Sequence, residues 1–152
     1  MESQAAAAKK PPQNVEAEQS ILGGVLLDNG VLDQVVDVVQ ENDFYRSSNR
    51  KIFVAMKEMS AKNEAIDYLT LQDRLKSQGL LDEIGGATYL ASLTDAVPSI
   101  GNIVHYARIV RDKAVARRLI SAATEILQAG LEVSDDVTNY LDRAEQLIFN
   151  VS

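Results

Sequence analysis

Apolar residues recur along most of this chain every three or four positions, which is the spacing of an α-helix. Between residues 14 and 98 the repeat comes in short blocks separated by turn signals such as Asp28-Asn29-Gly30. This pattern predicts a helical head made of short helices over residues 14–98. Residues 1–13 have no such repeat and contain two adjacent prolines, so we expect them to form a flexible tail.

The sequence pattern changes after residue 98. A run without glycine or proline extends from about Asn102 to Gln128, and Gly130 is expected to interrupt it. A second helix is expected from Asp135 to about Asn150, with its cap among Ser134-Asp135-Asp136. The pattern predicts a long antiparallel helical hairpin over residues 99–151. The expected fold class is therefore all-α, a globular bundle of short helices followed by a long antiparallel helical hairpin.

Several local signals mark the expected helix ends in the head. Asn14 and Asp67 are good N-caps, Ser47 or Ser48 can cap another helix, and Gly79 is a natural residue after a helix end. The valine-rich stretch 31–39 has features of a strand and of a helix, and its spacing favours a helix. Gly23-Gly24 interrupts a helical pattern, and we interpret the pair as a point where another helix approaches closely.

The hairpin carries more apolar surface than its two helices can bury together. In the last helix an a/d seam is expected to pack on the preceding helix, and Tyr140 and Leu147 widen this seam on one side. The seam comprises Val137, Leu141, Ala144, Ile148 and Val151. The preceding helix has two adjacent stripes: Val115, Leu119, Ala122 and Ile126, and then Ala116, Ile120, Ala123 and Leu127.

One partner helix covers one stripe, so the second stripe indicates an interface. Two alternatives stay open: the stripe packs on another molecule, or it packs on the chain's own head. The predicted interface residues are Val115, Ala116, Leu119, Ile120, Ala123, Leu127, Tyr140 and Leu147.

Composition limits the chemistry that the chain can perform. There is no cysteine and a single histidine, His105, which we expect to be partly buried and structural. No GxxxxGK[ST] loop is present, so no nucleotide phosphate site is expected. We predict no catalytic residue, cofactor or metal in this chain. No apolar stretch suits a membrane helix and no signal peptide is visible, so a soluble intracellular protein is expected.

The chain has a net charge of −7, and one cluster of basic residues stands out against it. Arg108, Arg111 and Arg118 fall on one helical face, which is a possible basic contact for a phosphate or an acidic partner. The alternative is an ordinary solvated face, because no aromatic residue is interleaved to stack bases. A stand-alone helical DNA-binding domain using the Arg108–Arg118 face remains an alternative function, although the acidic net charge argues against it.

Seven segments, in order, resemble the N-terminal domain of DnaB-family bacterial replicative helicases. They are Pro12–Gly24, Asp43–Arg46, Asn49–Phe53, Leu69–Leu71 with Leu75, Gly79–Leu81, Gly85–Leu90 and Asn102–Val110. Each motif alone is weak, but the whole set in register is specific.

The resemblance implies an oligomerisation and primase-docking domain. Its partners would be itself, as a dimer or a hexameric collar built as a trimer of dimers, and primase. The ATPase motor domain, with its ATP and Mg, would be absent from this chain, so this fragment would not be an enzyme. The full-length parent would unwind duplex DNA 5′-to-3′, contact DNA mainly through that motor, and work in the bacterial cytoplasm at the replication fork, not at a membrane.

Overall fold

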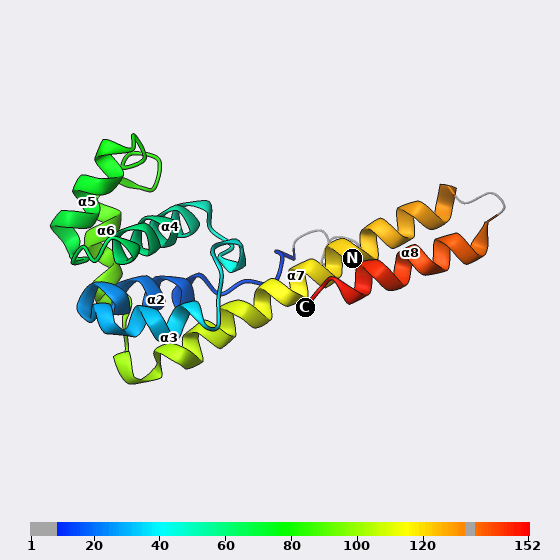
Figure 1. The fold of residues 1–152 in the computed structure, drawn as a ribbon, viewed down its shortest axis with the longest axis horizontal. Coiled ribbons are helices and arrows are strands. Elements are labelled where there is room, and N and C mark those ends of the chain that lie inside the picture. Colours follow the sequence, from blue (N-terminus) through cyan, green and yellow to red (C-terminus); the bar gives the residue numbers. More distant parts are fainter. Residues whose placement is uncertain (1–8, 133–135) are drawn as a thin grey trace.

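The computed structural model describes residues 9–132 and 136–152 as a globular head from which a helical hairpin projects (Figure 1). In the hairpin, α7 (Ile103–Glu132) leaves the head and α8 (Val137–Phe149) folds back beside it. Over the described residues every regular element is helical, which confirms the predicted all-α fold class. The head comprises α2 (Val15–Leu27), η1 (Asn29–Val31), α3 (Leu32–Val36), η2 (Glu41–Asp43), α4 (Ser47–Ala61), α5 (Tyr68–Ser77), α6 (Gly86–Leu93), η3 (Thr94–Ala96) and η4 (Ile100–Asn102).

Helix α2 lies at the centre of the head, and its start and its glycines behave as predicted. The Asn14 side chain accepts a hydrogen bond from the Ala17 N–H at 3.0 Å, so the predicted N-cap is confirmed. A Cβ added at Gly23 would lie 2.0 Å from the Leu93 carbonyl oxygen, and one at Gly24 would lie 2.6 Å from Ile103 Cδ1. The glycines therefore let the end of α6 and the start of α7 approach α2, as we interpreted.

The predicted serine cap of α4 is wrong. Helix α4 begins at Ser47, and its N-cap position is Arg46, which makes no side-chain capping hydrogen bond. A residue distant in the sequence instead binds the backbone that leads into the helix. The buried carboxylate of Glu18 on α2 accepts the N–H of Tyr45 at 2.7 Å and that of Arg46 at 3.3 Å. This contact ties α2 to the start of α4.

The helix predicted over residues 31–39 is shorter than expected. The chain forms η1 and then α3, which ends at Val36, and Val38 and Val39 follow outside any helix. The N–H groups of Val38 and Val39 still donate to the Val35 carbonyl oxygen at 3.0 Å, and Val39 is buried, so the chain leaves the helix through one last hydrogen-bonded turn.

The other local signals in the head are confirmed. The Asp67 carboxylate accepts the Thr70 N–H at 2.9 Å and caps α5. Gly79 has a φ of 72°, the left-handed conformation that suits a residue just after a helix.

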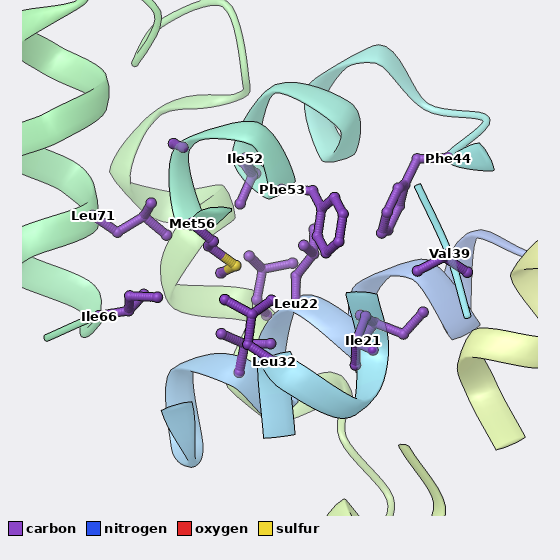
Figure 2. Close-up of a cluster of buried hydrophobic side chains, with 14 of the residues drawn as sticks. Ile21, Leu22, Leu32, Val39, Phe44, Ile52, Phe53, Met56, Ile66 and Leu71 are labelled. Carbon is purple, nitrogen blue, oxygen red and sulfur yellow. The ribbon is translucent and has the colours of Figure 1, made fainter. Parts of the chain in front are cut away.

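The core of the head gathers side chains from α2, α3, α4 and α5 (Figure 2). The rings of Phe44 and Phe53 pack with centroids 4.8 Å apart, in the same cluster as Ile21 and Val39. The first half of α7 completes this core with three buried residues: Ile103, Ala107 and Val110. Since α7 is one continuous helix, the same rod that closes the core also carries the hairpin.

Two predictions about the hairpin tip are decided by the helix ends. The interruption expected at Gly130 is wrong, because α7 continues through it to Glu132. Asp136 caps α8, since its carboxylate accepts the Asn139 N–H at 2.9 Å. Ser134 and Asp135, the other members of the predicted cap, lie outside the described residues.

Candidate interaction surface on the hairpin

Helix α8 packs on α7 through a narrow strip of side chains. The Tyr140 hydroxyl donates a hydrogen bond to the Ile126 carbonyl oxygen at 2.7 Å, and Tyr140 and Leu147 are both half-buried. On α7 this strip contains Ala122, which is 6% exposed, and the half-buried Ile126. Tyr140 and Leu147, two predicted interface residues, therefore lie largely against their own α7.

The predicted a/d seam of α8 is wrong. Its members Val137, Leu141 and Ile148 are 67%, 55% and 46% exposed, although Ala144 and Val151 are half-buried. The helix is rotated so that Tyr140 and Leu147 face α7 in place of the seam. The physical reason is that Tyr140 satisfies its hydroxyl on a backbone carbonyl of α7, which an aliphatic residue cannot do.

The second stripe on α7 is exposed. Ile120 and Leu127 are 52% and 63% exposed, Ala123 is exposed, and Ala116 is half-buried. The alternative that this stripe packs on the chain's own head is therefore wrong. Its packing on another molecule stays a prediction.

The exposed rows of the two helices lie on one side of the hairpin. At about 100° per residue, the Ile120–Leu127 row lies about 130° around α7 from the strip that touches α8. The Leu141–Ile148 row lies about 90° around α8 from its own contact strip. The two helices run antiparallel (Figure 1). By helix geometry, both rotations therefore turn toward the same side. We call this surface the hairpin face: Leu119, Ile120, Ala123, Leu127 and Leu131 of α7 with Val137, Leu141 and Ile148 of α8.

Sequence reasoning found only part of this face. Leu119 is 46% exposed and belongs to it, whereas Val115, nearer the head, is half-buried. On α8 the prediction chose Tyr140 and Leu147 for the interface and placed Val137, Leu141 and Ile148 in the seam, and it did not include Leu131, which is 80% exposed. A signal was available: α8, like α7, carries two adjacent apolar rows, and one partner helix covers only one.

One of the three predicted basic residues, Arg118, already binds groups of its own chain. Arg118 Nη1 pairs with the Asp43 carboxylate at 2.8 Å, and Arg118 Nε donates to the Val151 carbonyl oxygen at 2.9 Å. It thus joins the head to the end of the hairpin. Arg108 and Arg111 are exposed, and their contact with a phosphate or an acidic partner stays a prediction. With Arg118 engaged and a net charge of −7, the alternative of a stand-alone DNA-binding domain is not favoured.

Arg117 strengthens the same junction. Its guanidinium donates to the carbonyl oxygens of Pro12 at 2.7 Å and Asp43 at 2.8 Å, and lies 5.3 Å from the centre of the Tyr45 ring. Burial lowers the pKa of Arg117 from its ordinary value, and the negative charges of Glu18 and Asp43 oppose that shift. The end of the predicted flexible tail is therefore held against α7 at Pro12, while residues 1–8 lie outside the described residues.

The single histidine and the acidic residues lie apart in the described part of the chain. His105 is exposed on α7, so the partly buried position that we expected is wrong. Within residues 9–132 and 136–152, no group of three or more acidic or histidine side chains is placed to hold a metal ion. None of the helices described is both long and apolar enough to cross a bilayer.

An all-helical head with a projecting hairpin whose broad apolar face is open to solvent defines a class of protein–protein interaction domain. Comparison with known proteins identifies which one. The family model described as DnaB-like helicase N terminal domain matches residues 10–112. The chain therefore belongs to the DnaB-like helicase N-terminal domain family, as its sequence motifs indicated.

Curated relatives and solved structures agree with this assignment. The chain is 44% identical to the replicative DNA helicase DnaB of Geobacillus stearothermophilus and 41% identical to the replicative DNA helicase DnaC of Bacillus subtilis, each over 93% of its length. It spans about a third of the length of these relatives (31%).

A crystal structure of the N-terminal domain of DnaB helicase from Mycobacterium tuberculosis matches with a TM-score of 0.86 at 37% identity, covering 93% of this chain and 99% of that one. A structure of a DnaB-like replicative helicase and its interactions with primase shares the fold, with a TM-score of 0.73 at 20% identity over 91% of this chain and 32% of that one.

Proposed function

We propose that this domain self-associates through the hairpin face and that the assembled form docks primase within a replicative DNA helicase. The observation that carries the proposal is the exposure of apolar rows from both α7 and α8 on one side of the hairpin. Soluble monomers rarely leave a contiguous apolar surface of this kind open. A second copy offers the same two rows, so pairing of two hairpins would cover both at once.

Charge and family support the same assignment. The named members of the hairpin face are all apolar, and the charged Glu145 lies beside Leu141 and Ile148 at its edge, which suits an apolar interface core with a polar rim. The DnaB-like helicase described together with its primase interactions shares this fold. A dimer, or a collar built as a trimer of dimers, is the form of assembly that we propose.

The longer relatives suggest the setting of the domain. They are replicative DNA helicases of which this chain spans about a third. We propose that the longer protein uses ATP and Mg in a separate motor to unwind duplex DNA 5′-to-3′ at the replication fork, in the bacterial cytoplasm. The role of the present domain is assembly and partner docking, and DNA contact belongs mainly to the motor.

Titration of purified bacterial primase into this domain tests the docking role. We expect saturable binding to the unchanged chain and about tenfold or more weaker binding to Ile120→Asp/Leu127→Asp, because the variant should disrupt the paired form that primase recognises. Isothermal titration calorimetry measures both affinities. Absence of binding to the unchanged chain contradicts primase docking, and equal binding to both chains contradicts its dependence on pairing.

A further inference from the structure

Gly130 occupies an unusual place, inside the last turns of the long helix α7. Glycine weakens a helix interior, so its presence there needs a reason. A Cβ added at Gly130 would lie 2.3 Å from the Tyr140 hydroxyl oxygen and 2.8 Å from the ring carbon that bears it. The phenol of Tyr140 therefore fills the space that a side chain at Gly130 would need.

The hydroxyl of Tyr140 is fixed at the same spot. It donates to the Ile126 carbonyl oxygen at 2.7 Å, one helical turn before Gly130. The ring thus lies over the α7 backbone at Gly130, where there is no side chain, and its hydroxyl is hydrogen-bonded to the same backbone. We call this arrangement the Gly130–Tyr140 seat.

Helix α8 has little else to hold it in register. None of its residues is fully buried, and a helix of 13 residues is marginal by itself in water. Its Arg143–Glu125 ion pair joins two side chains that are 60% and 51% exposed, and exposed pairs of this kind contribute little. The other specific anchor lies at the opposite end of the hairpin, where Arg118 donates to the Val151 carbonyl oxygen.

We propose that the Gly130–Tyr140 seat sets the register of α8 on α7 and thereby decides which α8 side chains join the hairpin face. The inference rests on the proposed self-association, for which the intended partner is a second copy of this chain. Tyr140 acts as a positioning residue. With its ring on Gly130, Leu141 and Ile148 turn to the side that Ile120 and Leu127 occupy; a slip or rotation of α8 would move them away.

The test uses Gly130→Ala in two backgrounds, with Gln128→Ala as a matched control at an exposed position of α7. Alanine favours a helix over glycine, so Gly130→Ala alone would ordinarily raise the melting temperature. We expect the opposite: a lower melting temperature and about tenfold weaker self-association, because the seat is blocked. In a Tyr140→Ala background, the same Gly130→Ala change should raise the melting temperature. A rise in both backgrounds would overturn the proposal.

A distance measurement separates the register from simple stability. The chain has no cysteine, so cysteines introduced at Thr124 and Glu145 would be its only sites for spin labels. We expect Gly130→Ala to shift or broaden the distance distribution between the labels and Gln128→Ala to leave it unchanged. An unchanged distribution in Gly130→Ala overturns the register claim. If the unchanged chain stays monomeric, self-association fails as a function, and the label distance still decides the register by itself.

Discussion

Ile120→Asp combined with Leu127→Asp should leave the head folded and convert the self-associated domain into a monomer. In the single chain these side chains are 52% and 63% exposed, so charge at either position costs little within the monomer. At a paired hairpin face each carboxylate would have to be buried without a partner. Losing a central apolar anchor costs about 2 kcal/mol or more, which is roughly thirtyfold in the dissociation constant per residue.

The matched control for this variant is Leu69→Asp on α5 in the head, where the side chain is 73% exposed. Light scattering reports the mass of each variant, and circular dichroism on the same sample reports its helicity. We expect the control to remain associated like the unchanged chain. A double variant that keeps both its helicity and its full assembled mass contradicts the assignment of the hairpin face.

Gly23→Ala should be the most destabilising small change in the head. The added methyl would meet the Leu93 carbonyl oxygen at 2.0 Å and Val97 Cγ2 at 2.7 Å, and the backbone carbonyl cannot move aside without shifting the end of α6. Overpacking of this kind typically costs about 1–3 kcal/mol, and contact with backbone places Gly23 at or above the upper end.

The adjacent glycine provides the control. Gly24→Ala meets only the tip of the Ile103 side chain, which can rotate, and alanine gains up to about 1 kcal/mol of helix propensity over glycine. We therefore expect Gly24→Ala to be close to neutral, with the difference between the two variants measured by urea unfolding. Equal losses of stability in both would show that the close approach of α6 is not the reason for Gly23.

The sequence predicts those helix caps and helix ends that depend on residues close together in the chain. The caps at Asn14 and Asp67 and the helix end at Gly79 follow from side chains that act within a few positions of themselves. The contact that holds the start of α4 could not be predicted in this way. Its acceptor, Glu18, lies 27 residues before Tyr45 along the chain, and only the packing of α2 beside α4 brings the two together.

The hairpin face was likewise predictable only in part. Two adjacent apolar stripes on one helix exceed what one partner can cover, so the exposed row at Ile120 and Leu127 could be inferred from spacing alone. Which row of α8 faces α7 could not, because the rotation of α8 depends on the contact between Tyr140 and the glycine at 130. The sequence pattern predicts an interruption at Gly130, whereas in the structure this glycine is a contact point inside the helix.

The mass of the unchanged domain in solution, measured by light scattering across a range of concentrations, tests self-association through the hairpin face most directly. A single chain has a mass of 16.6 kDa. We predict a dimer or a multiple of dimers that dissociates only on dilution. A mass that stays at one chain at every concentration, in a sample that circular dichroism shows to be helical, would contradict the account.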